Sequence, residues 1–285
     1  MEALGFGLAA AILWAVHDLL TRKLSQGQAL LPLISVVLAA GCVTLVPFAA
    51  EAADWQAMTA AAWGLALASG LAFAVAIGSL YRAFSLAPVR LVSPVIGAYP
   101  LLSLAIAAAA GRSVTAADWA ACVAIVAGIA VVATATRDDA PEGYAAPPQV
   151  AFGWSLAAAA GFAATFALGQ AAARHGAELP AILIGRVTAL VVILALMAGR
   201  RPVGALPRRQ VWIVALMGVL DAAALGLVTA AGSLPRAEYA SVASSLFGVL
   251  TVLLAAWFLK ERVRGKQALG IGLVFAGIGA LGLQG

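Results

Sequence analysis

Long apolar segments recur along this chain, bounded by short clusters of charged residues, proline and glycine. Leu183–Leu196, for example, contains a single charged residue. A helix needs about 20 apolar residues to cross the ~30 Å hydrocarbon core of a bilayer. Lipid offers no partners to backbone N–H and C=O groups, so spanning segments with such runs must be helical. The runs lack the alternating polarity of β-barrel strands, and we exclude that class.

A polar stretch near the middle of the chain divides the apolar segments into two groups. This stretch, Arg137–Gln149, has the acidic, proline-containing composition of a linker. We predict a first five-helix repeat at residues 1–136, a linker at 137–150 and a second repeat at 151–285. The ten predicted spans lie near residues 4–22, 30–49, 61–84, 90–110, 116–135, 151–172, 179–198, 210–232, 237–258 and 266–283.

An internal repeat supports this division. Gly5 matches Gly153 and Pro32 matches Pro180, both at an offset of 148 residues. Matched glycine and proline carry more weight than matched alanine, because alanine is abundant in this chain. The same offset joins Leu8 with Leu156, Gly70 with Gly218, Leu86 with Leu234 and Ser93 with Ser241, and an offset of 149 joins Ala127-Gly128-Ile129 with Ala276-Gly277-Ile278.

The odd number of spans in each repeat has a topological consequence. A second copy that follows five spans starts on the opposite side of the membrane, so the copies insert upside-down to each other. A pseudo-two-fold axis in the membrane plane then relates them, and a site near the midplane can open to either side. The predicted fold is therefore an all-α membrane protein of ten helices, arranged as two inverted repeats around a central cavity.

Composition excludes several other classes of protein. Hydrophobic residues make up 64% of the chain and charged residues 10%, too few to cover a water-soluble surface. The formal net charge is +5, but the basic residues stand singly or in pairs at the ends of apolar runs, which argues against nucleic-acid binding. Cys42 and Cys122 lie in apolar runs without metal-ligand spacing, so we expect small buried side chains. The first twenty residues lack a basic leader and a cleavage signal, which predicts a retained helix.

The sequence also resembles a known family. It is similar over essentially its whole length to the EamA-type proteins of the drug/metabolite transporter superfamily. Two positions depart from the family pattern: Gly248 stands where the second copy usually has proline, and Arg112 where the first copy usually has glutamate. The resemblance rests on Leu13-Trp14 followed by Lys23, on Tyr99-Pro100-Leu101-Leu102-Ser103 and on Leu259-Lys260-Glu261-Arg262.

This resemblance implies export or uptake of small metabolites without ATP hydrolysis. Partners would be a small-molecule substrate and membrane lipid, and the protein would be a monomer or homodimer in a bacterial inner (plasma) membrane. Catalytic serine–histidine–acid sets, phosphate-binding glycine loops and metal clusters are absent from the sequence pattern. We therefore expect no enzyme activity, cofactor or bound metal.

Two arguments about orientation disagree. Loops after odd-numbered spans hold most of the basic residues, and the positive-inside rule then places both termini outside the cytoplasm. Members of the resembled family usually have both termini inside, so both orientations stay open. The even-numbered loops hold Arg112, Arg174 and Arg236, and the odd-numbered loops hold Arg22, Lys23, Arg82, Arg90, Arg137, Arg200, Arg201, Arg208, Arg209, Lys260, Arg262, Arg264 and Lys266.

Arg186 and Asp221 are the most deeply placed charged residues in the predicted spans. They lie 11 and 10 positions from Met197 and Val211, which flank the same loop. Both therefore lie roughly 15–17 Å from that loop at 1.5 Å rise per residue. Consecutive antiparallel helices would bring the two side chains into an ion pair. The pair either only fastens two helices together or lines a central cavity, where it could bind a carboxylate or a proton.

Trp14, His17 and Asp18 share one face of the first span, because they follow i, i+3, i+4 spacing. On a cavity-facing side they would place an aromatic ring beside two titratable groups, as a proton-coupled transporter requires. The alternative is a polar helix end that reaches the membrane interface near Arg22.

The fourth span carries Pro94, Gly97 and Pro100, and each proline removes a backbone hydrogen bond. We expect a kinked helix with a hinge or gating role, since broken helices at matching places in two repeats mark transport sites. Close helix packing explains small residues equally well. The counterpart segment in the second half carries Ser244, Ser245 and Gly248.

Two tyrosines could lie in the cavity or in an interfacial aromatic belt. Tyr99 belongs to the kinked segment, and we include it among the candidate substrate-contacting residues. Tyr239 lies near Arg236 and Glu238, and for this residue we favour the interface.

Taken together, the sequence predicts a secondary transporter that moves a small amphipathic metabolite, such as an amino acid or similar zwitterion, by alternating access. Protons are a candidate coupling ion. The expected cavity would hold the basic Arg186 together with the acidic Asp18 and Asp221. This mixture of charges favours a zwitterionic substrate. A multidrug or organic-cation exporter is one alternative, and a lipid flippase subunit or membrane scaffold is another.

Overall fold

The computed structural model describes residues 2–51, 54–109, 115–137, 145–199, 206–231, 244 and 246–284, and the secondary structure in these ranges is helical. The first half contains α1 (Glu2–Leu24), α2 (Leu30–Glu51), α3 (Ala60–Leu86), α4 (Val89–Gly97), α5 (Tyr99–Ala109) and α6 (Ala116–Arg137). The second half contains α7 (Pro148–Arg174), α8 (Glu178–Ala198), α9 (Arg208–Ala231), α11 (Phe247–Phe258) and α12 (Gly265–Gln284).

Five of these helices, α2, α3, α7, α8 and α9, are long and apolar enough to cross a membrane. Shorter apolar helices lie in α6, α11 and α12. Large apolar side chains such as Val43, Trp119 and Trp257 are exposed on the outside of the bundle. Such a surface is costly in water and suits lipid, so the chain is an integral membrane protein.

The fourth predicted span is two helices. α4 ends at Gly97 and α5 begins at Tyr99, with Ala98 between them in a non-helical conformation. Pro94 lies inside α4 and Pro100 is the second residue of α5, so the backbone bonds that would join the helices are lost at the expected place. In the second half α11 starts at Phe247, which matches Tyr99 at the repeat offset of 148 residues.

Some expected features fall outside the described residues. These are most of the linker, the first part of the ninth predicted span with Tyr239 and Ser241, and Ser245. Arg112 and Arg236 also lie outside the described residues.

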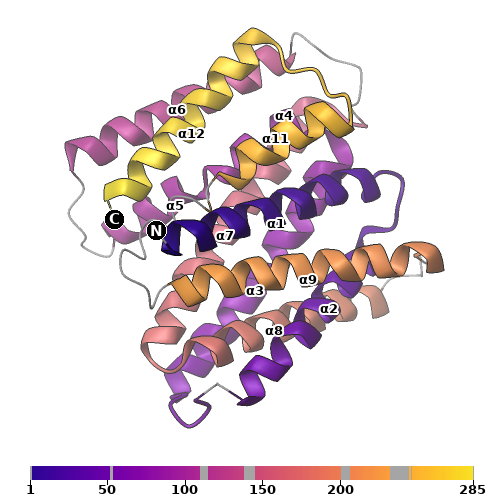
Figure 1. Cartoon of the computed structure of the whole chain (residues 1–285), viewed down its shortest axis with the longest axis vertical. Helices are drawn as coiled ribbons and strands as arrows, with labels where there is room; N and C mark the ends of the chain where they lie inside the picture. The colour runs from indigo at the N-terminus through magenta and orange to yellow at the C-terminus, as the bar shows by residue number, and fades with distance from the viewer. Residues whose placement is uncertain are drawn as a thin grey trace.

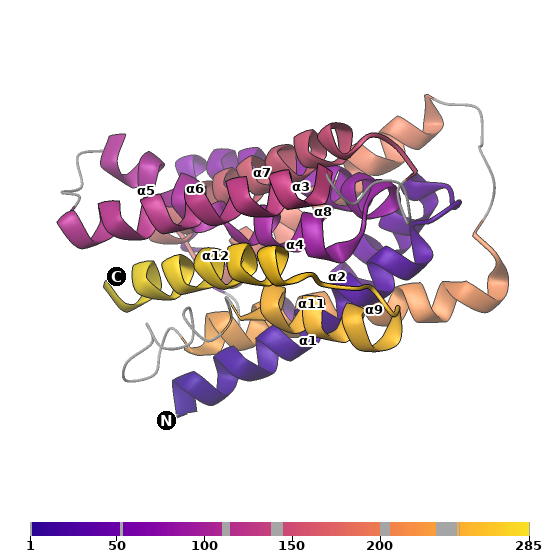
Figure 2. The same cartoon turned by 90° about the horizontal axis from the view of Figure 1, so that it is seen from above.

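The helices form a layered bundle (Figures 1 and 2). α6 and α12 lie side by side at one edge, and α2 and α8 lie at the other, with α1, α4, α9 and α11 between them (Figure 1). The packing is reciprocal between the halves: α3 packs against α7 and α8, while α9 packs against α1 and α2. Other contacts also join helices across the halves, among them those of α2 with α8, α4 with α11 and α6 with α12.

The closest helix crossings occur at glycines that the repeat relates. A Cβ at Gly70 of α3 would lie 2.5 Å from the carbonyl oxygen of Gly185 in α8. A Cβ at Gly218 of α9 would likewise collide with the carbonyl oxygen of Val37 in α2. Gly218 is 148 residues after Gly70, and Gly185 is 148 residues after Val37. The two crossings are therefore equivalents of each other with the halves exchanged.

A second reciprocal pair of contacts joins α6 and α12. A Cβ at Gly128 would lie 2.6 Å from the carbonyl oxygen of Gly270, and one at Gly277 would lie 2.8 Å from that of Ala121. The residue numbers of the contacting positions increase along α6 while those of their partners decrease along α12, so these helices are antiparallel. Gly128 and Gly277 also match at the offset of 149 residues.

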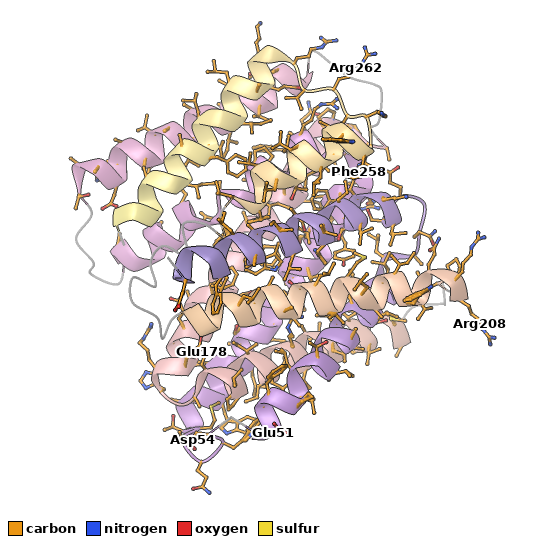
Figure 3. All side chains as sticks on the ribbon, viewed as in Figure 1. Glu51, Asp54, Glu178, Arg208, Phe258 and Arg262 are labelled. Atoms are coloured by element: carbon orange, nitrogen blue, oxygen red, sulfur yellow. The ribbon has the colours of Figure 1, made fainter. Side chains whose placement is uncertain are left out.

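The labelled charged residues lie at opposite ends of the bundle according to their sign (Figure 3). Arg208 and Arg262 lie at the end where α9 begins and α11 finishes. Glu51, Asp54 and Glu178 lie at the opposite end, where α2 finishes and α8 begins. We call these the basic end and the acidic end. The start of α1 and the finish of α12 both lie at the acidic end (Figure 1).

Two expectations about individual side chains need correction. Arg82 and Arg90 belong to α3 and α4 and not to a loop; Arg82 is exposed, whereas Arg90 is buried. Cys42 is buried as expected, but Cys122 is only half-buried on α6, and both are free thiols. Helix α6 lies at the edge of the bundle, which leaves part of its surface uncovered by protein.

Candidate functional site

Arg186 and Asp221 form an ion pair that joins α8 to α9. The Nη2 atom of Arg186 donates to Oδ2 of Asp221 at 2.6 Å. The other carboxylate oxygen, Oδ1, accepts a hydrogen bond from the indole Nε1 of Trp14 in α1 at 3.0 Å. The expected ion pair is therefore present, and a residue 207 positions away along the chain completes it.

The Arg186 side chain has unused hydrogen-bonding capacity. The residue is 3% exposed, and its Nε and Nη1 atoms are buried without a hydrogen-bond partner. Its guanidinium lies over the ring of Phe73, with the Cζ atom 5.5 Å from the centroid. A Cβ at Gly41 of α2 would lie 2.5 Å from Nη1, so only glycine leaves room for this arrangement. Buried unpaired donors beside one occupied donor can receive an anionic group.

His17 and Asp18 form a second buried cluster on α1. The His17 Nδ1 atom lies 3.1 Å from Oδ1 of Asp18, and its Nε2 atom lies 3.2 Å from the hydroxyl oxygen of Tyr81 in α3. The Thr21 hydroxyl donates to the His17 carbonyl oxygen at 2.9 Å. His17 and Asp18 are 4% and 5% exposed, so these side chains pack inside the bundle. The sequence analysis missed Tyr81, because nothing along the chain links it to His17.

Aromatic side chains continue from Arg186 toward the helix break. Phe73 lies 6.3 Å from Phe162, which lies 6.3 Å from Phe166 on the same helix, α7. The Phe166 ring lies 5.2 Å from that of Tyr99 at the start of α5. These residues form an aromatic series with the candidate residue Tyr99 at one end and Arg186 at the other. On the other side, Trp14 packs edge-on against Phe247, with ring centroids 6.0 Å apart.

The candidate hinge residues meet at a common aromatic ring. A Cβ at Gly97 would touch the Phe275 ring of α12 at 3.5 Å, and one at Gly248 would approach it to 2.6 Å. Pro94 is buried inside α4, and the Pro100 backbone lies in α5. The hinge and gating role of these residues stays a prediction, but both broken segments contact the same side chain.

A third polar cluster lies at the basic end of the bundle. The Nη1 atom of Arg22 donates to the Phe84 carbonyl oxygen at 2.6 Å, and its Nε atom lies 3.4 Å from Oε1 of Glu261. The side chains of Arg22 and Glu261 are 6% and 11% exposed. Together these contacts join α1, the end of α3 and the segment after α11. Arg22 therefore binds other helices, and it does not contact Asp18 among the interactions the structure describes.

The Arg22 cluster gives a first prediction. Glu261→Gln removes the charge that partly neutralises a buried guanidinium, and we expect a loss of about 1 kcal/mol in the free energy of unfolding. The exchange Arg22→Glu with Glu261→Arg should not restore stability, because the new carboxylate would face the Phe84 carbonyl oxygen. Denaturant unfolding in detergent measures both effects. Lys23→Gln is the matched control, since Lys23 is the exposed neighbour of Arg22; full rescue by the exchange would contradict this account.

Within the described ranges, no three His, Cys, Asp or Glu side chains gather into a metal-binding group.

Comparison with known protein families identifies the chain as a whole. The model of the EamA-like transporter family matches residues 1–134 and again residues 150–283. The chain belongs to the EamA-like transporter family. Its two matched segments coincide with the two repeats deduced from the sequence offset, so each half of this EamA-like transporter is one copy of the family unit.

Solved structures support the fold of this EamA-like transporter. One crystal structure, described only as that of a protein, has a TM-score of 0.66 at 16% sequence identity. The similarity covers 99% of this chain and 96% of that one. No curated protein matches the sequence. Membership of the family makes the chain a membrane transporter of small molecules.

Proposed function

We propose that this EamA-like protein is a secondary transporter that carries a small amphipathic metabolite, an amino acid or similar zwitterion, by alternating access. The membrane would be a bacterial inner (plasma) membrane. The observation that carries this proposal is that buried polar side chains and an aromatic series meet inside the bundle and come from repeat-related positions of the two halves.

The contacts between the halves support ten spans in two inverted repeats. The glycine crossings at Gly70 and Gly128 are reproduced at Gly218 and Gly277 with the partners exchanged, as a two-fold axis requires. α6 and α12, the last helices of the two halves, run antiparallel, so this axis would lie across the helices and not along them. An axis in the membrane plane allows one fold to adopt two states that a two-fold rotation relates, open to opposite sides.

The repeat relates a polar wall to an aromatic wall. At the offset of 148 residues, Trp14 matches Phe162 and Asp18 matches Phe166. In the same way Asp221 matches Phe73. Trp14, Asp18 and Asp221 belong to the polar clusters, whereas the matched phenylalanines form the aromatic series. Two-fold mates lie across the axis from each other, so the walls would face each other over a central cavity. A substrate between them needs an apolar part and a charged part.

The charges of the polar wall favour a zwitterion. The unpaired Nε and Nη1 atoms of Arg186 are suited to a carboxylate, which Arg can bind through two parallel hydrogen bonds. Asp18 and Asp221 can balance an ammonium group. Trp14 holds one Asp221 oxygen, so this carboxylate stays oriented while Arg186 exchanges partners. The mixed charge of the site would therefore match a small amino acid with an apolar side chain.

Ligand-dependent stabilisation tests the proposal directly. We expect zwitterionic amino acids to raise the melting temperature of the purified protein, because a ligand that binds only the folded state stabilises it. The corresponding amines and acids, which carry one charge each, should stabilise it less. Arg186→Gln should remove the response. Equal responses to acids, amines and amino acids would contradict the proposed charge pairing.

Proton coupling is a separate part of the proposal and rests on His17 and Asp18. Asp18→Asn keeps the shape of the side chain but removes its titration, so we expect flux driven by a proton gradient to fall roughly tenfold or more. Exchange of labelled substrate without a gradient should fall much less. Asp54→Asn, in a loop at the acidic end, is the control. Unchanged proton-driven flux in Asp18→Asn vesicles would rule this carboxylate out as the coupling group.

Organic-cation export is the second candidate, because two carboxylates, the buried Asp18 and the part-buried Asp221, could bind a cation. The two functions differ in their need for Arg186. If Arg186→Gln vesicles still transport an organic cation such as tetraphenylphosphonium, cation export is favoured. If they lose transport of amino acids and gain no cation flux, the zwitterion proposal is supported.

A further inference from the structure

A second polar site lies at the basic end, apart from the Arg186 and His17 clusters. All nine residues of α4, Val89–Gly97, are buried, because α3, α5, α6, α7, α11 and α12 pack around this helix. Arg90 is the second residue of α4 and is only 9% exposed. A basic side chain near a membrane surface normally reaches lipid or water. Helices enclose Arg90 instead, so its burial requires a different explanation.

Among the residues that the structure describes, none pairs with the charge of Arg90. Its Nε atom is buried without a hydrogen bond, and no ion pair involves this residue in the part of the chain that the structure describes. Ser93 is 1% exposed, and its hydroxyl oxygen is also buried without a partner. Helical spacing of three residues places both side chains on one face of α4. Two unsatisfied buried polar side chains on one face indicate a missing partner.

The local backbone adds further donors. α4 starts after Pro88, and no side chain caps its first N–H groups. The N–H groups of Leu91 and Val92 bond to the Pro88 carbonyl oxygen, whereas those of Val89 and Arg90 make no such bond. The start of a helix also carries a partial positive charge. Arg90 and these N–H groups therefore supply only donors, and the Ser93 hydroxyl can donate as well, which suits an oxyanion.

We propose that Arg90 and Ser93 form an anion site for a phosphoryl group, separate from the transport site. The guanidinium Nε–H and an Nη–H can bind two oxygens in parallel, and the serine hydroxyl can donate to a third. A phosphoryl group offers three such oxygens, whereas a carboxylate offers two. Arg90 lies eight residues before Ala98, or about 12 Å along α4 from the helix break. Its occupant would thus bind without displacing a substrate at Arg186.

The phosphoryl group could belong to a lipid headgroup or to a soluble phosphate, and two measurements distinguish these sources. In the first, inorganic phosphate is titrated against delipidated protein in a neutral maltoside detergent. In the second, phosphatidylglycerol is added to the same micelles at low phosphate concentration. The melting temperature is followed in both, since an occupant that binds the folded protein raises it. If only one of the two additions raises the melting temperature, that addition identifies the source of the phosphoryl group. Either outcome supports the site.

Substitutions at matched positions decide whether Arg90 is responsible. Arg90→Gln should abolish the response, and Ser93→Ala should raise the half-saturating concentration roughly tenfold. Arg82→Gln removes an exposed charge at the same end of the bundle and should leave the response unchanged. If Arg90→Gln does not fold, the Ser93→Ala shift still tests the site. The proposal is wrong if neither arm stabilises the wild-type protein, or if Ser93→Ala and Arg90→Gln respond as the wild type does.

Discussion

Asp221→Asn is expected to lower the free energy of unfolding by about 3–5 kcal/mol and to abolish transport, because it leaves the buried Arg186 guanidinium without its counter-charge. The Asn side chain keeps the shape of Asp and can still accept a hydrogen bond from Trp14. The effect therefore reports the charge and not a cavity. Denaturant unfolding in detergent measures stability, and uptake by reconstituted vesicles measures transport.

Glu51→Gln is the matched control for Asp221→Asn, since Glu51 is an exposed acid at the acidic end of α2. A double variant, Arg186→Met with Asp221→Leu, separates the two roles of the ion pair. Replacing both partners of a buried pair by apolar residues often costs little stability. If the pair only fastens α8 to α9, the folded double variant should transport normally. If the pair binds substrate, the double variant should fold and show no flux.

Gly218→Ala is expected to destabilise the protein by about 3 kcal/mol, at the upper end of the usual cost of overpacking. The added methyl group would collide with the Val37 carbonyl oxygen, a backbone atom that cannot rotate away. α2 and α9 would have to separate. Gly226→Ala on the same helix is the control, because a Cβ there meets nothing within 4 Å. Alanine is the better helix former, so Gly226→Ala should be neutral or slightly stabilising.

The repeat extends this prediction to the other half. Gly70→Ala should cost about as much as Gly218→Ala, since Gly70 meets the Gly185 carbonyl oxygen at the equivalent crossing. Gly78→Ala on the same helix meets nothing within 4 Å and serves as its control. Thermal unfolding of the four variants measures the costs. Strongly unequal costs at Gly70 and Gly218 would show that the two crossings are not mechanically equivalent.

The symmetry of the crossings contrasts with the asymmetry of the site. Gly70 and Gly218 keep glycine in both copies, because a Cβ at either position would collide with the backbone of the neighbouring helix. The positions assigned to the two proposed walls differ between the copies: the repeat matches Trp14 with Phe162 and Asp221 with Phe73. Packing therefore constrains the crossings, whereas the walls are free to differ. In the proposed transport site, this difference would give distinct polar and aromatic sides.

Much of the fold was predictable from the chain alone. Lipid requires about 20 apolar residues in a helix, and this requirement acts locally, so segment lengths and the break between Pro94 and Pro100 could be expected from the sequence. The repeat offset depends only on residue order. The Arg186–Asp221 ion pair followed from the depth of two residues on consecutive helices. It lies at the expected position in the structure.

The sequence by itself thus determined the membrane class, the duplication and the intramembrane charges. Only the tertiary structure decided which of these residues meet. Trp14 bonds Asp221, Tyr81 bonds His17, and Arg22 reaches Glu261. The burial of Arg90 was equally unforeseen, because a residue near the end of an apolar run was expected in a loop. These contacts depend on the rotation and crossing of helices far apart in the chain, and helical spacing within one segment carries no information about either.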